Sequence, residues 1–309
     1  MMPQLLIAAF RNIRKNKTYS LLNIVGLGIG IACAGLIALW MEDELGFDRM
    51  HVKADQLYEV KVNMKLGDKV LTMHSTPRPL AAAIEFEIPG IVHAARYSDN
   101  EQRLPVTIND RSVYSSGRYA DPQLFEMFSF HFLEGSVSKP FSQLHSVVIT
   151  DEFAGKVFGD ERNVLGKTIR LDNKQDYTVS GVVSKLPENS TLQFEWLAPY
   201  QVLTSAMNNA DGTNDATDWS SYGPVTFVEL DKSTSLKNVN DKLKDFIKSK
   251  SADQKKESFL FPVTGLRLYN EFNEGRATGG GRISQVNLFG IIAWIILLIA
   301  CINFMNLAT

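Results

Sequence analysis

Two long apolar segments interrupt a mixed pattern of polar and hydrophobic positions. The first, from Leu21 to Trp40, contains no charged residue, and at ~1.5 Å per residue a helix of this length covers the ~30 Å hydrocarbon core of a bilayer. The second, from 283 to 309, is also uncharged and is densest from Phe289 to Ile302. We therefore predict two membrane-spanning helices, at residues 19–41 and 283–309, around a large middle segment.

The charges beside the first span predict its orientation. Basic residues precede the span without an acidic one, and acidic residues follow it at once. These are Arg11, Arg14, Lys15 and Lys17 before the span, and Glu42, Asp43, Glu44 and Asp48 after it. Because cytoplasmic segments carry the excess of positive charge, we expect a cytoplasmic N-terminus and an extracytoplasmic domain over residues 42–282.

A cleaved signal sequence is the alternative for the first apolar segment. Ala32, Cys33 and Ala34 imitate a small-residue cleavage site after the apolar run from Leu21 to Ile31. A span is favoured because the whole run is longer than the ~7–15 residues that a signal needs.

Residues 1–18 are expected to form a basic amphipathic helix on the lipid of the cytoplasmic leaflet. Apolar side chains between Leu5 and Ile13 share one helical side, and basic residues surround the other. Within the first span, Gly26 and Gly30 have the small-xxx-small spacing of a helix-packing site, although glycines that face lipid would look the same.

Three consecutive glycines precede the second span. Gly279, Gly280 and Gly281 can adopt many backbone conformations. We expect them to act as a hinge where the chain returns to the membrane.

The middle segment alternates apolar and polar positions in short runs. Strands are expected at 57–64, 70–73, 91–97, 224–230 and 259–268, with helices at 79–87 and 236–248. These elements form two β-α-β units that are separated in sequence, so we predict a split ferredoxin-like lobe from about 55–100 and 222–270.

A second, mainly β lobe is expected between these units, at about 101–204. Its predicted strands are 106–108, 112–119, 145–150, 168–171 and 177–183, and a helix at 152–158 ends at Gly159. The fold class is therefore an α+β membrane protein, with two spans around a two-lobed extracytoplasmic domain.

Composition excludes some partners and cross-links. The chain has 32 basic and 34 acidic side chains and a formal charge of -2. Because this net charge produces no strong positive field, nucleic acid is not expected as a partner. The two cysteines, Cys33 and Cys301, both lie in the apolar segments, so the middle domain must fold without disulfides.

No catalytic, cofactor or metal site is expected. Gly166-Lys167-Thr168 resembles the end of a P-loop, but Glu161 stands where the first glycine is required and a strand is predicted to follow. The five histidines show no metal-ligand spacing. The sequence does not exclude a Ser-His-Asp triad, because its members can come from distant parts of the chain. Asn189-Ser190-Thr191 matches a glycosylation acceptor, a short pattern that often occurs by chance.

Several stretches, in order, resemble the FtsX-like permeases with a MacB-like periplasmic core domain, particularly the form common in Bacteroidetes. The stretches are AFRNIRKNKTYSLLNIVGLGIG, ELGFDRMHVKADQLYEV, DPQLFEMFSFHFLEG, SVVITDEFAGKVFGDERNVLGKTIRL, YTVSGVVSKLPENSTLQF and CINFMNLAT. Together they cover most of the chain, and their order is more specific than any one of them.

The resemblance implies a non-enzymatic, multi-pass permease subunit of a bacterial inner membrane, with its large domain in the periplasm. It implies a separate cytoplasmic ABC ATPase as partner, a dimer of permease units, and a periplasmic adaptor as a further partner. Export of peptides, antibiotics or lipoproteins and mechanical control of envelope enzymes both occur in the family. Its members continue beyond the second span, so the chain is expected to be an N-terminal portion.

Two other functions fit the same outline. A transmembrane receptor would bind a ligand with its extracytoplasmic domain and signal through the second helix. A passive anchored scaffold would show no dependence on an ATPase.

Overall fold

A computed structural model describes residues 17–108, 111–159, 161, 163–205, 207, 214–251 and 255–308. The described chain forms two compact units. One is a helical pair, built from the chain up to Gly46 and from Gly280 onward, and the other is a domain from Phe47 to Gly279. Each unit is considered by itself.

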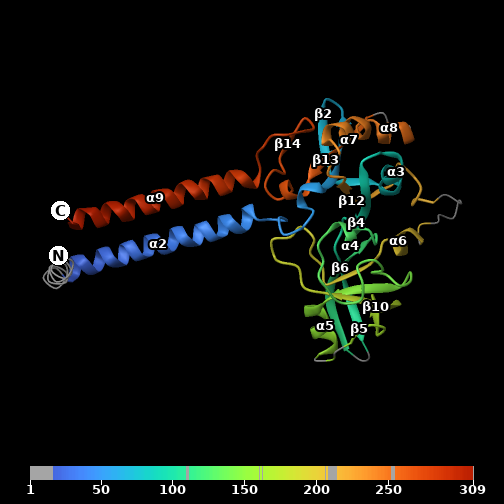
Figure 1. Cartoon of the computed structure of the whole chain (residues 1–309), viewed down its shortest axis with the longest axis horizontal. Helices are drawn as coiled ribbons and strands as arrows, with labels where there is room; N and C mark the ends of the chain where they lie inside the picture. Colours follow the sequence, from blue (N-terminus) through green and yellow to red (C-terminus); the bar gives the residue numbers. More distant parts are fainter. Residues whose placement is uncertain are drawn as a thin grey trace. The chain divides into compact units, whose positions relative to one another are not determined.

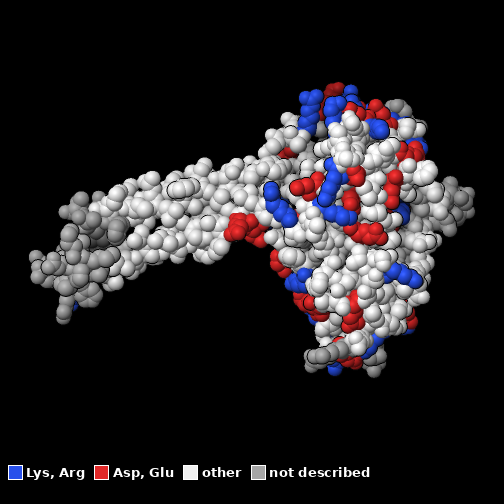
Figure 2. All heavy atoms as spheres, viewed as in Figure 1, with Lys and Arg blue, Asp and Glu red and all other residues white. Residues whose placement is uncertain are grey.

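The helical pair consists of α2 (Lys17–Leu45) and α9 (Arg282–Ala308) (Figure 1). By length and composition, Ser20–Leu45 and Arg282–Asn303 can each cross a membrane, with mean hydropathies of 2.3 and 2.4. On the face seen in Figure 2, the two helices are almost entirely uncharged, whereas the domain shows both signs of charge intermixed.

Helix α2 continues four residues past the predicted span end at 41, because Glu42 to Leu45 complete a further helical turn. The amphipathic helix predicted over residues 1–18 lies outside the described residues, apart from its last two positions, which belong to α2.

The domain contains the remaining elements, several of which are labelled in Figure 1. Its helices are α3 (Leu80–Glu87), α4 (Leu124–Met127), α5 (Asp151–Phe158), α6 (Gln201–Ser205), α7 (Leu236–Leu243) and α8 (Phe246–Lys250), with 3-10 turns at Ala54–Gln56 and Val263–Gly265. Its strands are β1 (Leu57–Leu66), β2 (Lys69–Met73), β3 (Ser75–Pro77), β4 (Ile91–Ser98), β5 (Gln102–Ile108), β6 (Arg111–Ala120), β7 (Phe132–Glu134), β8 (Ser146–Thr150), β9 (Thr168–Leu171), β10 (Gln175–Val183), β11 (Trp196–Pro199), β12 (Tyr222–Leu230), β13 (Lys256–Pro262), β14 (Phe272–Asn273) and β15 (Arg276–Ala277).

The first lobe is a sheet in the order β4-β12-β1-β13 with antiparallel neighbours. Helix α3 buries Leu80, Ala81 and Ile84 against the sheet, and α7 and α8 bury Val239 and Ile247 in the same hydrophobic core. The apolar positions of each helix recur at the spacing of one helical face, which is why these segments cover the sheet.

The insert closes into a barrel-like ring of strands. Hydrogen-bonded neighbours run β5-β6-β11-β8-β10-β9 and return to β5. Such closure leaves no open edges among these strands. Trp196 fills the interior opposite Gly117, where an added Cβ would lie 2.0 Å from the indole ring. Glycine is therefore required at 117 because the indole occupies the space of a side chain.

The two lobes share one sheet and are joined by a hydrophobic cluster, beside the cluster that each lobe has of its own. Strands β4 and β6 pair at Tyr97 and Ala120. A single hydrophobic cluster joins Leu57 and Phe227 of the first lobe to Phe125 and Phe128 of the insert. The lobes are therefore expected to unfold together.

The local predictions fail at two places in the second β-α-β unit. The helix predicted over 236–248 is two helices, because the chain breaks at Lys244 and Asp245 between α7 and α8. The strand predicted over 259–268 ends at Pro262, where a 3-10 turn begins. Helices α4 and α6 and strands β3, β7, β11, β14 and β15, each five residues or shorter, were not predicted.

Candidate functional site at the helix junctions

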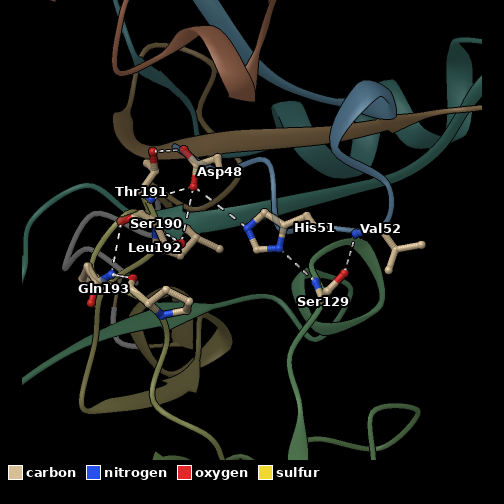
Figure 3. A network of polar contacts seen from close by, with 9 residues as sticks. Asp48, His51, Val52, Ser129, Ser190, Thr191, Leu192 and Gln193 are labelled. Atoms are coloured by element: carbon tan, nitrogen blue, oxygen red, sulfur yellow. Dashed lines mark hydrogen bonds and ion pairs between the residues drawn. The ribbon is translucent and has the colours of Figure 1, made fainter. Parts of the chain in front are cut away.

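The first residues of the domain are held by a polar cluster, which we call the anchor cluster: the buried residues Asp48, His51 and Ser190, with Ser129 and Thr191 (Figure 3). Helix α2 ends at Leu45, and the domain begins two residues later, at Phe47. The cluster therefore starts only three residues after the helix.

Asp48 is the centre of the anchor cluster and is completely buried. Its backbone N–H donates to the carbonyl oxygen of Asn189 at 2.9 Å. Its carboxylate accepts the backbone N–H of Thr191 at 2.7 Å, the hydroxyl of Thr191, and the hydroxyl of Ser190 at 3.4 Å. Asp48 has a φ of 58°, a left-handed conformation that aspartate tolerates better than most residues.

His51 extends the cluster to another part of the insert. Its Nδ1 accepts the backbone N–H of Ser129 at 3.2 Å, and its ring packs edge-on against Phe128. The backbone N–H of Val52 donates to the hydroxyl of Ser129 at 2.9 Å. Two reciprocal bonds thus join residues 51–52 to Ser129.

Lys53 ties the same segment to the first lobe. Its ammonium group lies 2.8 Å from the carboxylate of Glu229, on β12, and donates to the carbonyl oxygen of Glu126 at 3.0 Å. Within six residues, the entry segment is therefore bonded to the loop before β11, to the end of α4 and to the central sheet. The entry segment is therefore in contact with both lobes.

Burial shifts the pKa values of the two ionisable groups in opposite senses. The pKa of His51 is lowered from 6.5 to about 4 by burial, so the imidazole is neutral at physiological pH. The pKa of Asp48 is raised by burial, against the effect of the hydrogen bonds from Thr191 and Ser190. The Nε2 atom of His51 lies 4.0 Å from Asp48 Oδ1, beyond hydrogen-bonding distance.

Although serine, histidine and aspartate meet here, their geometry does not match a nucleophilic triad. Ser129 presents its backbone N–H to His51, while its hydroxyl accepts a bond from Val52. A triad requires the hydroxyl to be bonded to the imidazole. His51 and Asp48 are also buried from solvent, so the arrangement favours a structural role.

The helical pair carries its own polar contact, which we call the helix clamp. Arg282, at the start of α9, forms a forked ion pair with the carboxylate of Glu44, with Nε 2.6 Å from Oε2. Two aromatic rings, of Trp40 and Phe289, pack edge-on at 5.2 Å along the same pair. The fork and the ring contact hold these ends of the two helices together.

The two glycines that were predicted to form a helix-packing site have different surroundings in the structure. At Gly30 an added Cβ would lie 2.8 Å from the Cβ of Ala300, so α2 and α9 approach closely there. At Gly26 no described atom lies within 4 Å of the added Cβ. The close approach of these two helices therefore involves Gly30, and the role of Gly26 stays a prediction.

The predicted hinge glycines lie at the boundary between the units. The domain ends at Gly279, and the helical pair resumes at Gly280. Gly279 and Gly281 have φ values of 76° and 117°, which residues other than glycine rarely adopt. The conformation requires glycine at both positions, whereas hinge motion stays a prediction.

Two sequence motifs have structural explanations. Gly166 lies in a turn and is followed by strand β9, whereas a P-loop is followed by a helix. Lys167 forms an ion pair with Glu161. In the glycosylation-acceptor pattern, the hydroxyl of Thr191 is bonded to Asp48.

Sequence analysis missed the role of the anchor and clamp residues, although all except Arg282 lay in stretches already selected for other reasons. Asp48 and His51 fall in the ELGFDRMHVKADQLYEV stretch, and Ser190 and Thr191 in YTVSGVVSKLPENSTLQF. The available signal was an isolated aspartate and histidine directly after a span. Nothing in the sequence indicated that Asp48 meets residues 143 positions away.

Comparisons with known proteins agree with this architecture. The family model described as MacB-like periplasmic core domain matches residues 20–246. A domain assigned to a permease protein from Porphyromonas gingivalis is 22% identical, with a TM-score of 0.56 over 78% of this chain and 99% of that one. No curated protein matches the chain.

Two further solved structures share the similarity at lower scores. The periplasmic region of MacB from Actinobacillus actinomycetemcomitans is 14% identical, with a TM-score of 0.49 over 69% of this chain and 92% of that one. The extracellular domain of the noncanonic ABC-type transporter YknZ from Gram-positive bacteria is 13% identical, with a TM-score of 0.48 over 66% of this chain and 99% of that one.

An α/β extracytoplasmic domain between two apolar helices defines the class as a membrane-anchored domain of permease type. The family match covers well over half of the 309 residues. The chain belongs to the MacB-like periplasmic core domain family, and the predicted resemblance is confirmed.

Proposed function

We propose that this chain is part of the permease subunit of an ABC transporter, and that it couples ATP hydrolysis by a separate cytoplasmic ATPase to movement of its extracytoplasmic domain. It resides in the bacterial inner membrane with a cytoplasmic N-terminus. Its exported substrates are of the peptide, antibiotic or lipoprotein type, or its movement acts on the envelope directly. Family membership supports the permease class.

The anchor cluster is the observation that carries the coupling proposal. Only Gly46 and Phe47 separate the end of α2 from Asp48, which is bonded to the insert. A helix displacement cannot be absorbed by so short a connection. The helix clamp joins α9 to α2 through the forked Arg282–Glu44 ion pair, so α9 moves together with α2.

Other parts of the proposal rest on the same family. The subunit acts as a dimer of permease units, with a periplasmic adaptor as a further partner. We also infer that the first lobe is a split ferredoxin-like fold, supported by the antiparallel order β4-β12-β1-β13, by α3 between β1 and β4, and by α7 and α8 between β12 and β13.

The decisive test compares two insertions. Four flexible residues, Gly-Ser-Gly-Ser, are inserted between Gly46 and Phe47 in one variant and between Gly280 and Gly281 in the other. The first insertion should abolish the outside function while folding and membrane insertion persist, and the second should leave function largely intact. Both are expressed in the native host within the full-length gene.

The required comparison is a strain whose partner ATPase is catalytically dead. The first insertion and the dead ATPase should give the same profile of antibiotic susceptibility and envelope-stress response. Distinct profiles, or full function with either change, would contradict coupling. A receptor would also be sensitive to the insertion, but its defect would not match that of an ATPase mutant.

Orientation has a separate test. Alkaline phosphatase fused after Ser205 should be active, because the fusion point lies in the predicted extracytoplasmic domain. A fused reporter that functions only in the cytoplasm should be silent there. The reverse pattern would overturn the orientation and the function built on it.

A further inference from the structure

A groove of about 540 Å³ lies beside the sheet of the first lobe, between the β1–β2 hairpin, helix α7, strand β13 and the β14–β15 hairpin (Figure 1). Its volume falls within the ~300–1,000 Å³ range of small-molecule sites in proteins. None of its described lining residues belongs to the anchor cluster or to the helix clamp. The groove is therefore separate from the site at the helix junctions.

The lining of the groove has an excess of positive charge. Five of its side chains are basic and three are acidic, a net charge of +2, whereas the whole chain has a formal charge of -2. The basic residues are Lys65, Lys244, Lys248, Lys255 and Arg276, and the acidic ones are Asp241, Glu257 and Glu274. Because a cleft with an excess of one sign of charge concentrates ions of the other sign, the lining favours an anion.

The three carboxylates of the lining already have partners. Asp241 pairs at 2.7 Å with a lysine outside the groove, and Glu257 pairs with Lys248 at 2.9 Å. One carboxylate oxygen of Glu274 accepts the backbone N–H of Val70 at 3.2 Å. Most of the negative charge is therefore engaged in contacts within the domain.

Three hydrogen-bond donors of the lining are left for a ligand. Within the part of the chain that the structure describes, the side chains of Lys65 and Arg276 make no hydrogen bond or ion pair. The Oδ1 atom of Asn240 accepts the backbone N–H of Leu260 at 2.8 Å, which fixes the amide and leaves its Nδ2 hydrogens available. An ammonium, a guanidinium and an amide thus line one groove.

Two contacts hold the β14–β15 hairpin, which carries the guanidinium, against the β1–β2 hairpin, which carries Lys65. The Nδ2 atom of Asn63 donates to the carbonyl oxygen of Gly275 at 2.8 Å, and Glu274 accepts from Val70. An added Cβ at Gly275 would lie 2.6 Å from Asn63 Nδ2, and the φ there is 75°. Glycine is therefore required at this turn, and the two cations are held on hydrogen-bonded hairpins.

A phosphate monoester matches this set of donors. At neutral pH such a group carries a charge of about −1.5 to −2 and three strong acceptor oxygens, which is close to the opposite of the net charge of the lining. A guanidinium binds phosphate through two parallel N–H donors, and an ammonium binds it as a point charge. The lining also includes Val70 and Phe259, so an organic substituent on the phosphate would find apolar contacts.

We propose that this groove binds the phosphate group of an organic monoester, with Arg276 and Lys65 on the phosphate oxygens and Phe259 against the substituent. The monoester is either a soluble compound or a lipid headgroup. The proposal does not depend on coupling to an ATPase.

Isothermal titration calorimetry tests this with the whole chain in dodecyl maltoside micelles at constant ionic strength. The probes are phenyl phosphate and phenyl sulfate, which have the same shape, although the sulfate carries a single negative charge. Phenyl phosphate should bind about tenfold more tightly, because its additional charge is attracted by the net positive charge of the lining. Equal affinities for the two probes would overturn the proposal.

Two variants locate the binding. Lys65→Gln and Arg276→Gln should each weaken the binding of phenyl phosphate about tenfold, because each removes a charged donor. The matched controls Lys232→Gln and Arg103→Gln remove exposed cations that do not line the groove, and they should leave the affinity unchanged. All four side chains are exposed, so the variants should melt like the unmodified chain. Equal effects of the groove and control variants would overturn the proposal.

Two further ligands distinguish the sources of the phosphate. Glycerol 3-phosphate is soluble, whereas phosphatidic acid presents the same monoester from the micelle. Tighter binding of phosphatidic acid would identify a lipid headgroup, and tighter binding of glycerol 3-phosphate a soluble ligand. In either case, Arg276→Gln should weaken the binding.

A hexaglutamate peptide is the competing ligand. If this peptide bound in a manner that Arg276→Gln abolishes, and no phosphate monoester bound, the proposal would be overturned and the groove assigned to an acidic polypeptide. The assay contains neither ATPase nor ATP, so its failure would leave the coupling proposal standing.

Discussion

The chain enters and leaves its extracytoplasmic domain through two different kinds of connection. At the entry, the buried side chain of Asp48 accepts hydrogen bonds from the insert, three residues after the helix end. At the exit, three glycines run from the domain boundary to the start of α9, and two of them have positive φ. The first connection fixes the backbone by long-range bonds, while the second depends on the conformational freedom of glycine.

Under the coupling that we propose, this difference would let the domain be driven from one end only. The hydrogen-bonded connection would transmit displacement of α2, and the glycine connection would act as the predicted hinge for α9. The Glu44–Arg282 clamp keeps the two helices paired. The following changes should break or sharpen the contrast, in order of expected effect.

Asp48→Ala should have the largest effect on the domain. It removes a buried acceptor of three hydrogen bonds and places alanine at a φ of 58°. We expect a loss of roughly 3 kcal/mol in the free energy of unfolding, or about 6–12 °C in melting temperature. Thermal unfolding followed by circular dichroism measures it.

Two controls interpret that loss. Asp218→Ala removes an exposed aspartate that also bonds to a neighbouring serine, Ser220, and should cost far less than Asp48→Ala. Asp48→Asn should cost much less than Asp48→Ala, because the amide retains an acceptor and removes a buried charge. Equal losses for Asp48→Ala and Asp218→Ala would show that the entry segment is not anchored by this cluster.

Acidification should weaken the anchor cluster through His51. Its pKa in the folded state, about 4, lies below the ordinary value of 6.5, so the unfolded chain binds more protons between these pH values. Stability should therefore fall as pH falls through this window, by roughly 2 kcal/mol from this group between pH 7 and 4.5. Urea denaturation at both pH values measures the change.

The contribution of Asp48 has the opposite sign. Burial raises the pKa of Asp48 in the folded state, so the folded chain binds a proton at this carboxylate more readily than the unfolded chain does. The free energy of unfolding therefore rises as pH falls from this raised pKa toward the ordinary pKa of aspartate. His51→Gln separates the two effects, because glutamine can still accept from Ser129 but does not titrate. The variant should lose less stability on acidification, and an unchanged pH dependence would contradict the assignment to His51.

The helix clamp should contribute a smaller coupling energy. A double-mutant cycle with Glu44→Gln and Arg282→Gln should give about 1–2 kcal/mol, because the fork is bidentate and Glu44 is buried. Melting of the chain in detergent supplies the four stabilities. The exposed Lys237–Asp241 pair serves as reference and should give a smaller coupling energy, because solvent screens it. A clamp value no larger than this reference would remove the clamp from the coupling argument.

Gly279→Ala should have the smallest effect. No described atom lies within 4 Å of the added Cβ, so the cost comes from the φ of 76° alone, about 1 kcal/mol. Gly155→Ala is the matched control, since it also meets no atom but lies in helix α5, where alanine should stabilise by about 0.5–1 kcal/mol. Urea unfolding should show opposite signs, and equal effects would refute a backbone requirement at Gly279.

The local part of the fold was predictable from periodicity. Strands β1, β4, β8, β9 and β10 and helices α3 and α5 lie within a few residues of the predicted segments. The capped start of α5 illustrates why: Thr150 accepts the N–H of Phe153, and Gly159 ends the helix. Such signals act over three or four residues. No sequence signal of comparable strength marks the break between α7 and α8, because Lys244 and Asp245 are ordinary helix residues.

The candidate site was less predictable than the fold. The glycines of the exit were visible as a run in the sequence, whereas the anchor of the entry was not. Asp48 is bonded to residues 189–191, and His51 to Ser129. Each of these contacts joins segments that lie far apart in the sequence.

The sequence by itself determined the two apolar helices, the strand and helix pattern between them and the family, because hydrophobic periodicity and ordered motifs are properties of neighbouring residues. Tertiary structure alone decided that the insert closes on itself, that Trp196 requires glycine at 117, and that one hydrophobic cluster joins the two lobes. It also decided that a lone aspartate becomes an anchor. These outcomes depend on contacts between distant segments, whose partners local periodicity does not specify.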